Sequence, residues 1–224
     1  MTGKDPDPEV LRERRERAGK INAELSRLFP DAAIALRYED PWQLLVAVIL
    51  SAQCTDKKVN EVTSELFAKY RTFDDYVRAD PGEFEQDIRQ TGFYRQKAKN
   101  ILKTARIIQE RHDGEVPETM EELTALPGVA RKTANIVLGN AFGKVEGIAV
   151  DTHVRRLAIK LRLTDNKDPN KIERDLMRLL PEEEWLDFTY RIIEYGRQIC
   201  PARKHDCTGH PLTKIYPPAA ETWP

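Results

Sequence analysis

The residues most suggestive of chemistry surround a short turn, Leu126-Pro-Gly-Val-Ala-Arg-Lys-Thr-Ala134, between two helical patterns. Pro127-Gly128 favours a tight reversal, and Gly128 can adopt positive φ and lacks a Cβ that would hold a phosphate away. Because the next helix begins at once, its unpaired first-turn N–H groups and positive dipole end lie beside this hairpin. The pattern predicts a docking point for one phosphate, contacted through the backbone without reading base sequence.

Two side chains near this turn have types that suit catalysis. Lys132 is in the first turn of the second helix, where the helix dipole and the adjacent Arg131 favour the neutral amine, which is a nucleophile. The alternative is that Lys132 is one more phosphate contact. Asp151 follows the apolar run Gly147-Ile-Ala-Val150, a pattern that predicts a helix N-cap. If that cap faces a cleft, its carboxylate would stabilise an oxocarbenium-like transition state on a sugar.

The elements that must position these groups are helices, because helical periodicity predominates and strand-like alternation is scarce. The run around residues 44–50 is apolar on every side and predicts a buried helix. The spacing of Thr119 and Glu122 predicts a capping box, in which the hydroxyl accepts from a first-turn N–H and the carboxylate reaches back. We expect an all-α protein with helices near 9–28, 42–52, 57–70, 97–112, 132–142, 153–160, 170–180 and 185–195, and two short ones after residues 80 and 119.

Composition limits the class of protein. The chain has 224 residues, 36 Lys and Arg against 37 Asp and Glu, and three cysteines, which are too few for a secreted disulfide framework. The neutral total conceals basic segments: residues 91–112 contain six basic residues and one acidic, and residues 126–160 contain six and two. The N-terminus lacks the apolar run of a signal peptide, and no apolar stretch approaches the ~20 residues that cross a bilayer. We expect a soluble, cytoplasmic protein without a membrane partner.

Four motifs together resemble those of endonuclease III, the bifunctional DNA glycosylase family of the helix-hairpin-helix superfamily. They are Leu50–Asp56 (LSAQCTD), Thr91–Tyr94 (TGFY), Leu126–Asn135 (LPGVARKTAN) and Ala149–His153 (AVDTH), and they occur in the family's order. The similarity runs from Ile21 to Cys207. The resemblance implies an all-α protein of two lobes with a DNA-binding cleft between them: a six-helix barrel at 34–144 and a second helical domain formed by 1–33 and 145–224.

The resemblance also implies roles for individual residues. Lys132 would attack C1′ of a damaged nucleotide, expel the base, form a Schiff base and permit β-elimination, and Asp151 would activate the amine. Gln53 would fill the space that a flipped base leaves, and Phe93 would enter the base stack as a wedge. The alternatives are that Gln53 is a buried amide and Phe93 a core residue. The remaining expected DNA contacts are Leu126, Gly128, Ala130, Arg131, Thr133 and His153.

The function that follows is that of a monomeric glycosylase and abasic-site lyase of base excision repair, acting on double-stranded damaged DNA near the nucleoid. The family favours oxidised pyrimidines, although no residue named above selects the base. Two other functions stay open. One is a monofunctional mismatch or damage glycosylase in which Lys132 only contacts phosphate. The other is a non-catalytic helix-hairpin-helix DNA-binding protein.

The chain departs from the family at two places. Ala130 stands where a second hairpin glycine is usual, and we expect phosphate binding to persist. The family's C-x6-C-x2-C-x5-C motif binds a four-iron, four-sulfur cluster, but here Cys200 and Cys207 are followed by His210 and Tyr216 in a degenerate loop at 200–216.

Two thiolates and one imidazole are a poor ligand set for such a cluster. We therefore expect the cluster to be lost and no cofactor or metal to be bound, with the loop held by packing of the C-terminal tail (Leu212, Ile215, Tyr216, Trp223). One alternative is zinc bound by Cys200, Cys207 and His210, with or without His205. The other is a cluster with unusual ligation. The third cysteine, Cys54, belongs to the Gln53 motif and is not expected in this loop.

Overall fold

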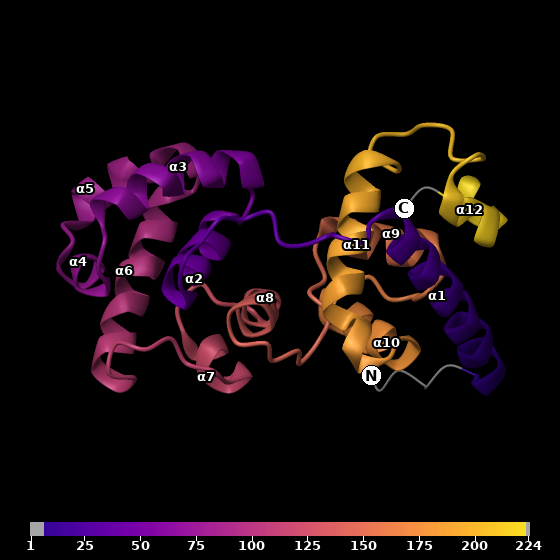
Figure 1. Ribbon diagram of the computed structural model, residues 1–224, viewed down its shortest axis with the longest axis horizontal. Coiled ribbons are helices and arrows are strands. Elements are labelled where there is room, and N and C mark those ends of the chain that lie inside the picture. Colours follow the sequence, from indigo (N-terminus) through magenta and orange to yellow (C-terminus); the bar gives the residue numbers. More distant parts are fainter. Residues whose placement is uncertain (1–6, 223–224) are drawn as a thin grey trace. The chain divides into compact units, whose positions relative to one another are not determined.

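The structure is a computed structural model that describes residues 7–222, and every regular element among them is a helix (Figure 1). The prediction of an all-α protein is confirmed. The α-helices are α1 (Pro8–Leu28), α2 (Pro41–Leu50), α3 (Asp56–Lys69), α4 (Phe73–Arg78), α5 (Pro81–Asp87), α6 (Tyr94–Arg111), α7 (Met120–Ala125), α8 (Arg131–Ala141), α9 (Thr152–Lys160), α10 (Pro169–Leu179), α11 (Trp185–Gln198) and α12 (Pro211–Ile215). The short 3-10 helices are η1 (Arg89–Thr91), η2 (Glu182–Glu184) and η3 (Pro217–Ala220).

The chain divides into two compact units. The central unit comprises 34–146 and contains α2 to α8, whereas the terminal unit combines the segments before residue 34 and after residue 146. Each unit has its own apolar core. The chain passes from one unit to the other at 33/34 and at 146/147.

The core of the central unit is built around α2, which is buried along its whole apolar run. Leu44 to Ala47 and Leu50 are fully buried, and α3, α6 and α8 pack against this helix. An aromatic cluster caps one side, where Trp42 meets Phe73 and Tyr76 edge to face at centroid distances of 5.0 and 5.2 Å. Such edge-to-face pairs add stabilisation beyond the area that they bury.

Helix starts follow the side-chain capping rule in most of the described chain. An Asp or Thr side chain accepts a hydrogen bond from a first-turn N–H of α1 to α5, α7, α9 and α10. In contrast, Phe93 precedes α6 and Ala130 precedes α8, and neither offers a side-chain acceptor. The helices that begin in the Phe93 and hairpin motifs are therefore among those whose first-turn amides receive no side-chain cap.

The capping box predicted at Thr119 is only half correct. The Thr119 hydroxyl accepts a hydrogen bond from the Glu122 N–H at 3.3 Å. The Glu122 carboxylate, however, accepts a hydrogen bond from that same hydroxyl at 2.6 Å instead of from the backbone N–H of Thr119. A complete capping box occurs at α4, where Thr72 accepts from the Asp75 N–H and the Asp75 carboxylate accepts from the Thr72 N–H. The sequence analysis did not anticipate α4.

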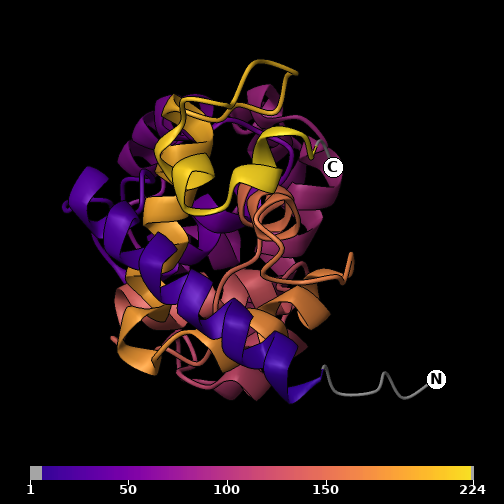
Figure 2. The same cartoon turned by 90° about the vertical axis from the view of Figure 1, so that its right-hand side faces the viewer.

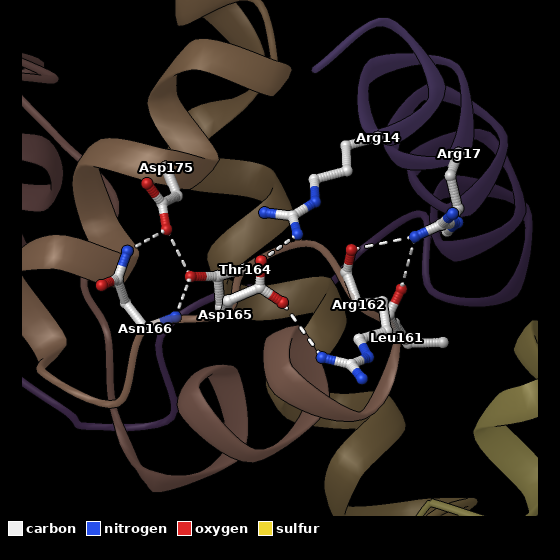
Figure 3. A network of polar contacts seen from close by, with 8 residues as sticks. All are labelled: Arg14, Arg17, Leu161, Arg162, Thr164, Asp165, Asn166 and Asp175. Carbon is white, nitrogen blue, oxygen red and sulfur yellow. Dashed lines mark hydrogen bonds and ion pairs between the residues drawn. The ribbon is translucent and has the colours of Figure 1, made fainter. Parts of the chain in front are cut away.

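In the terminal unit, α1 packs against α10, α11 and α12 (Figure 2). A polar network fastens α1 to the turn after α9 (Figure 3). Arg17 donates to the carbonyls of Leu161 and Arg162 at 3.3 and 2.9 Å, which satisfies acceptors at the end of α9. Arg14 contacts Asp165, and Arg162 donates to the same carboxylate at 3.0 Å. The Arg14 hydrogen bond holds the pKa of Asp165 below its usual value.

The C-terminal tail forms α12 and η3, and it buries Leu212 and Ala219 in the terminal core. Trp223, which we expected to pack on the loop, lies outside the described residues. None of the helices within 7–222 has the length and hydropathy that a membrane span requires.

Candidate functional site

The hairpin between α7 and α8 is anchored by two buried side chains, Leu126 and Val129. The Val129 N–H donates to the Leu126 carbonyl at 3.2 Å and closes the turn around Gly128, whose φ is +80°. A Cβ on Gly128 would lie 2.5 Å from Nδ2 of Asn100, so both the backbone angle and the close approach of α6 require glycine. Because the Leu126 side chain is buried, any contact that it makes with DNA is through its backbone.

The first turn of α8 presents the predicted nucleophile to solvent. Lys132 is exposed, and its neighbours Arg131 and Thr133 are partly buried. Arg131 donates to the carbonyl of Glu146 at 3.4 Å, which draws its guanidinium toward the end of the central unit. Ala130 is exposed at the N-cap and adds no side-chain acceptor. The hairpin therefore combines an exposed amine with first-turn amides that its own cap residue does not occupy.

Two further turns in the central unit hold their predicted DNA-contacting residues in a strained conformation. Gln53 follows α2 with φ 53°, and Phe93 precedes α6 with φ 48°. Positive φ in non-glycine residues is uncommon and persists where surrounding structure enforces it, often at functional sites. Gln53 is exposed and Phe93 is 68% exposed. The alternative interpretation, a buried amide and a core aromatic, is therefore wrong.

Helix α6 supports all three turns from one face. Phe93, Lys97, Asn100 and Thr104 are spaced three or four residues apart, so they share a stripe on the helix. Thr104 Oγ1 donates to the carbonyl of Pro127 at 3.2 Å, and Asn100 packs against Gly128. Lys97 Nζ donates to the carbonyls of Leu50 and Thr91, both at 2.8 Å.

Lys97 does not belong to the basic surface that the charges of residues 91–112 suggested. Its side chain is 5% exposed, so it adds nothing to the basic surface of residues 91–112, and burial lowers its pKa. No role for Lys97 was expected from the sequence. A signal was available, because Lys97, Ile101 and Ala105 are four residues apart and the last two lie on the buried face.

The predicted catalytic carboxylate belongs to the terminal unit. Asp151 is the N-cap of α9 and accepts from the Val154 N–H at 2.8 Å, as the sequence predicted. It is partly buried after the buried residues Ile148 to Val150. His153 is packed against α11 at Gly196, where a Cβ would lie 2.7 Å from Nδ1 of His153. This glycine therefore allows His153 to lie close to α11.

A third group of reactive side chains lies between α11 and α12. The ligand atoms of Cys200, His205, Cys207 and His210 all lie within 4.8 Å of one another. The two cysteines are 1% exposed. This group contradicts the expectation that no cofactor or metal is bound here, because it could hold a metal ion. His205, which the zinc alternative had treated as optional, is folded against Cys207 with 3.2 Å between Nε2 and Sγ.

The sequence and the fold agree with one family of proteins. The model of HhH-GPD superfamily base excision DNA repair proteins matches residues 46–182. Endonuclease III of Synechocystis sp. is 51% identical over 206 residues, which covers 92% of this chain and 94% of the relative. The chain belongs to the endonuclease III family.

Solved structures of endonuclease III agree with this assignment. A non-covalent endonuclease III–DNA complex superimposes with a TM-score of 0.86 at 44% identity, covering 90% of this chain and 94% of the other. A trapped endonuclease III–DNA covalent intermediate gives a TM-score of 0.85 at the same identity and coverage. The two-lobed helix-hairpin-helix glycosylase fold that the motifs implied is therefore confirmed for this endonuclease III family member.

Proposed function

We propose that this endonuclease III family member removes damaged bases from double-stranded DNA and cleaves the strand at the resulting abasic site. Base excision repair by a DNA glycosylase and abasic-site lyase is the activity of the family to which the chain belongs. The observation that carries the assignment to particular residues is the exposed Lys132 in the first turn of an uncapped helix beside the Gly128 turn. That arrangement places a phosphate-binding backbone next to a nucleophilic amine.

In the reaction that we propose, Lys132 Nζ attacks C1′ of the damaged nucleotide as the bond from C1′ to the base nitrogen breaks. The base leaves with the electron pair and takes up a proton. Asp151, as an ionised carboxylate, stabilises the positive charge that develops on the sugar and accepts the proton that the amine loses. The sugar ring opens to a Schiff base with Lys132, loss of a C2′ proton expels the 3′ phosphate by β-elimination, and water then hydrolyses the imine.

The damaged nucleotide must leave the base stack before C1′ can be reached, at a cost of a few kcal/mol. We assign Phe93 as the apolar wedge that opens the stack and Gln53 as the residue that occupies the vacated space. Their exposure and their positive φ angles support these roles. The backbone of Leu126 to Ala130 and the side chains of Arg131, Thr133 and His153 would complete the contacts with DNA.

We further propose that the protein acts as a monomer on chromosomal DNA and that oxidised pyrimidines are its principal substrates. The lesion preference rests on the family resemblance alone, because no described residue distinguishes one damaged base from another. Duplexes that contain thymine glycol, an abasic site or an adenine mismatch would reveal the preference directly.

Borohydride trapping tests the role of Lys132. Wild-type protein and Lys103→Gln, which removes an exposed lysine of α6, should both form a covalent adduct with thymine-glycol duplex. Lys132→Gln should form none. Base release without an adduct in the wild type would favour the monofunctional glycosylase. Binding without base release or strand cleavage on any of these duplexes would favour the non-catalytic DNA-binding protein.

A further inference from the structure

The loop after α11 contains a group of two buried thiols and two partly buried imidazoles. Cys200, His205, Cys207 and His210 offer one donor atom each, and these atoms lie within 4.8 Å of one another. Both cysteines are free thiols. We propose that this group binds a single zinc ion in a closed, tetrahedral site that holds the loop between α11 and α12.

The family implies a four-iron, four-sulfur cluster at this place, and the residues present do not fit it. In such a cluster each cysteine binds a different iron, so its four donors are separated by the body of the cluster. Here the third and fourth positions are His210 and Tyr216 instead of cysteines. The Tyr216 ring lies beneath the Arg17 guanidinium, 4.1 Å from ring centroid to Cζ, and is engaged in a cation–π contact.

The spacing of the donors suits one metal ion. Zinc bonds of 2.3 Å to sulfur and 2.0–2.1 Å to nitrogen give tetrahedral edges of about 3.3–3.8 Å. The sulfur of Cys207 is 3.2 Å from Nε2 of His205, close to such an edge. None of the four donor atoms is more than 4.8 Å from another.

His205 is held in the tautomer that a metal needs. Its Nδ1 is 2.7 Å from the carbonyl oxygen of Arg203, so Nδ1 carries the proton and donates it. The lone pair is then on Nε2, the nitrogen that faces Cys207. Metal-binding histidines are commonly oriented in this way by a carbonyl behind the ring.

His210 supplies an independent observation. Its Nδ1 is buried and has no hydrogen-bond partner within the part of the chain that the structure describes. Its ring stacks on that of His205 with centroids 5.1 Å apart. Burying a ring nitrogen without a partner is unfavourable, and a metal ion bound at that nitrogen would remove the penalty.

Arg156 provides support around Cys200. Its guanidinium donates to the Cys200 carbonyl at 2.6 Å and to the Cys200 sulfur at 3.7 Å. A hydrogen bond to this sulfur fixes the position of the ligand from outside the donor set. Arg156 therefore belongs to the proposed site as a residue that orients and stabilises one ligand.

A two-iron cluster with two cysteines and two histidines is the nearest competing structure. In that cluster the cysteines bind one iron and the histidines bind the other. The 3.2 Å separation of Cys207 Sγ and His205 Nε2 instead suits one cysteine and one histidine that bind the same ion. We therefore favour mononuclear zinc.

Metal analysis of the purified full-length protein tests the proposal. We expect one zinc per chain, a colourless protein, and cobalt substitution that gives the visible bands of a tetrahedral site with thiolate ligands. Chelation should lower the melting temperature, and zinc should restore it. Iron and sulfide in the purified protein, or a chelated protein that takes up neither cobalt nor zinc, would overturn the proposal.

Variants localise the site. His205→Asn and Cys207→Ser should lose zinc and the cobalt spectrum. Cys54→Ser is the matched control, because Cys54 is the third thiol and belongs to the central unit. It should retain both. Full zinc occupancy in His205→Asn would exclude the four-ligand site, and the cobalt spectrum of the wild-type protein keeps the test valid if a variant does not fold.

A second inference concerns Lys97, and it rests on the proposed roles of Gln53 and Phe93. Lys97 Nζ joins the carbonyl of Leu50, at the end of α2, to that of Thr91, before α6. Gln53 lies three residues after Leu50, and Phe93 lies two residues after Thr91. We infer that Lys97 is a positioning residue that holds the Gln53 and Phe93 turns in a fixed position relative to each other.

The ammonium group is suited to this task. It is buried, its two carbonyl partners belong to separate turns, and each turn contains a residue with positive φ. Without the Lys97 ammonium group, the carbonyls of Leu50 and Thr91 would each lose one hydrogen bond. Both turns would then be free to relax. A misplacement of about 1 Å at an active site can cost about 100-fold in rate.

The test compares Lys97→Met with Lys99→Met, which removes an exposed charge from the same helix. Lys97→Met should slow single-turnover excision by about 10–100-fold and reduce the fluorescence of 2-aminopurine placed beside the lesion. Lys99→Met should change base opening little. In a Gln53→Ala/Phe93→Ala background, Lys97→Met should have little additional effect.

The outcomes separate the two levels of the argument. If Gln53→Ala/Phe93→Ala excises at the wild-type rate, the roles assigned to those two residues are wrong and the role of Lys97 falls with them. If that variant is slow but Lys97→Met is as active as Lys99→Met, only the inference about Lys97 is refuted. A full additional loss from Lys97→Met in that background would indicate a general structural role instead.

Discussion

Replacing Gly128 by alanine separates two reasons for glycine at the hairpin. The residue has φ +80°, and a Cβ there would lie 2.5 Å from Nδ2 and 3.1 Å from Cβ of Asn100. The positive φ costs about 1–2 kcal/mol for an L-residue. Displacing Asn100 adds an overpacking cost of about 1–3 kcal/mol. We expect Gly128→Ala to lower the free energy of unfolding by about 2–5 kcal/mol in total.

Gly143 offers a matched control in the same unit. Its φ is +66°, and no described heavy atom lies within 4 Å of the position where its Cβ would be. Gly143→Ala should therefore show the backbone cost alone, about 1–2 kcal/mol. The difference between the two variants measures the contact with Asn100.

Urea denaturation provides the assay, because equal m-values allow the midpoints to be compared as stabilities. Adding Asn100→Ala to Gly128→Ala should recover the part of the overpacking cost that comes from Nδ2 and Cγ of Asn100, and leave the backbone part. Equal losses in Gly128→Ala and Gly143→Ala would refute the argument that α6 requires glycine in the hairpin. Gly128→Ala should also weaken binding to undamaged duplex, whereas Gly143→Ala should not.

Three other predictions concern single side chains. Phe93→Ala should slow excision at least about tenfold, because the wedge offsets part of an unstacking cost of a few kcal/mol. Its thermal stability should change little, since the ring is 68% exposed. An unchanged rate of excision from lesion-containing duplexes would exclude the wedge. Thr72→Ala should lower the free energy of unfolding by about 1 kcal/mol, because it removes the complete capping box of α4. Chemical denaturation should show a smaller loss of stability for Thr119→Ala. Equal losses would contradict the difference between the two caps. Asp165 has a lowered pKa, so its ion pair with Arg14 contributes stability above the unfolded value near 3.8 and loses it as pH falls through the folded pKa. The wild type should therefore lose more stability than Asp165→Asn on acidification below about pH 4. The difference should be no more than about 1 kcal/mol because the Asp165 side chain is 59% exposed, and parallel pH profiles would refute this.

Much of the helical framework was predictable because its signals are local. Asp-Pro pairs at residues 40–41, 80–81 and 168–169 combine an N-cap with proline at the first helical position, and each opens a helix. The apolar run of α2 predicted a buried helix correctly. The Thr72–Asp75 spacing is also a local signal, and α4 was missed because a helix of six residues is too short to show periodicity.

The metal loop shows where local reasoning fails. The motif spacing of the family emphasises positions 200, 207, 210 and 216, so His205 received little weight and the ligand set seemed too small. In the structure the carbonyl of Arg203 turns the His205 ring toward Cys207. Which side chains converge in a loop depends on backbone turns that spacing alone does not specify.

The helical class, the hairpin with Lys132 at the start of the next helix, the Asp151 cap and the family are all readable from the sequence, because caps, periodicity and motifs are properties of neighbouring residues. Helical periodicity can also place Lys97 on the buried face of α6. The folded structure was needed to show which carbonyls Lys97 reaches, that Asn100 closes the space beside Gly128, and that four possible metal donors meet after α11. Lys97, for example, lies 6 positions from Thr91 and 47 positions from Leu50. The partners in such contacts are set by the packing of whole helices.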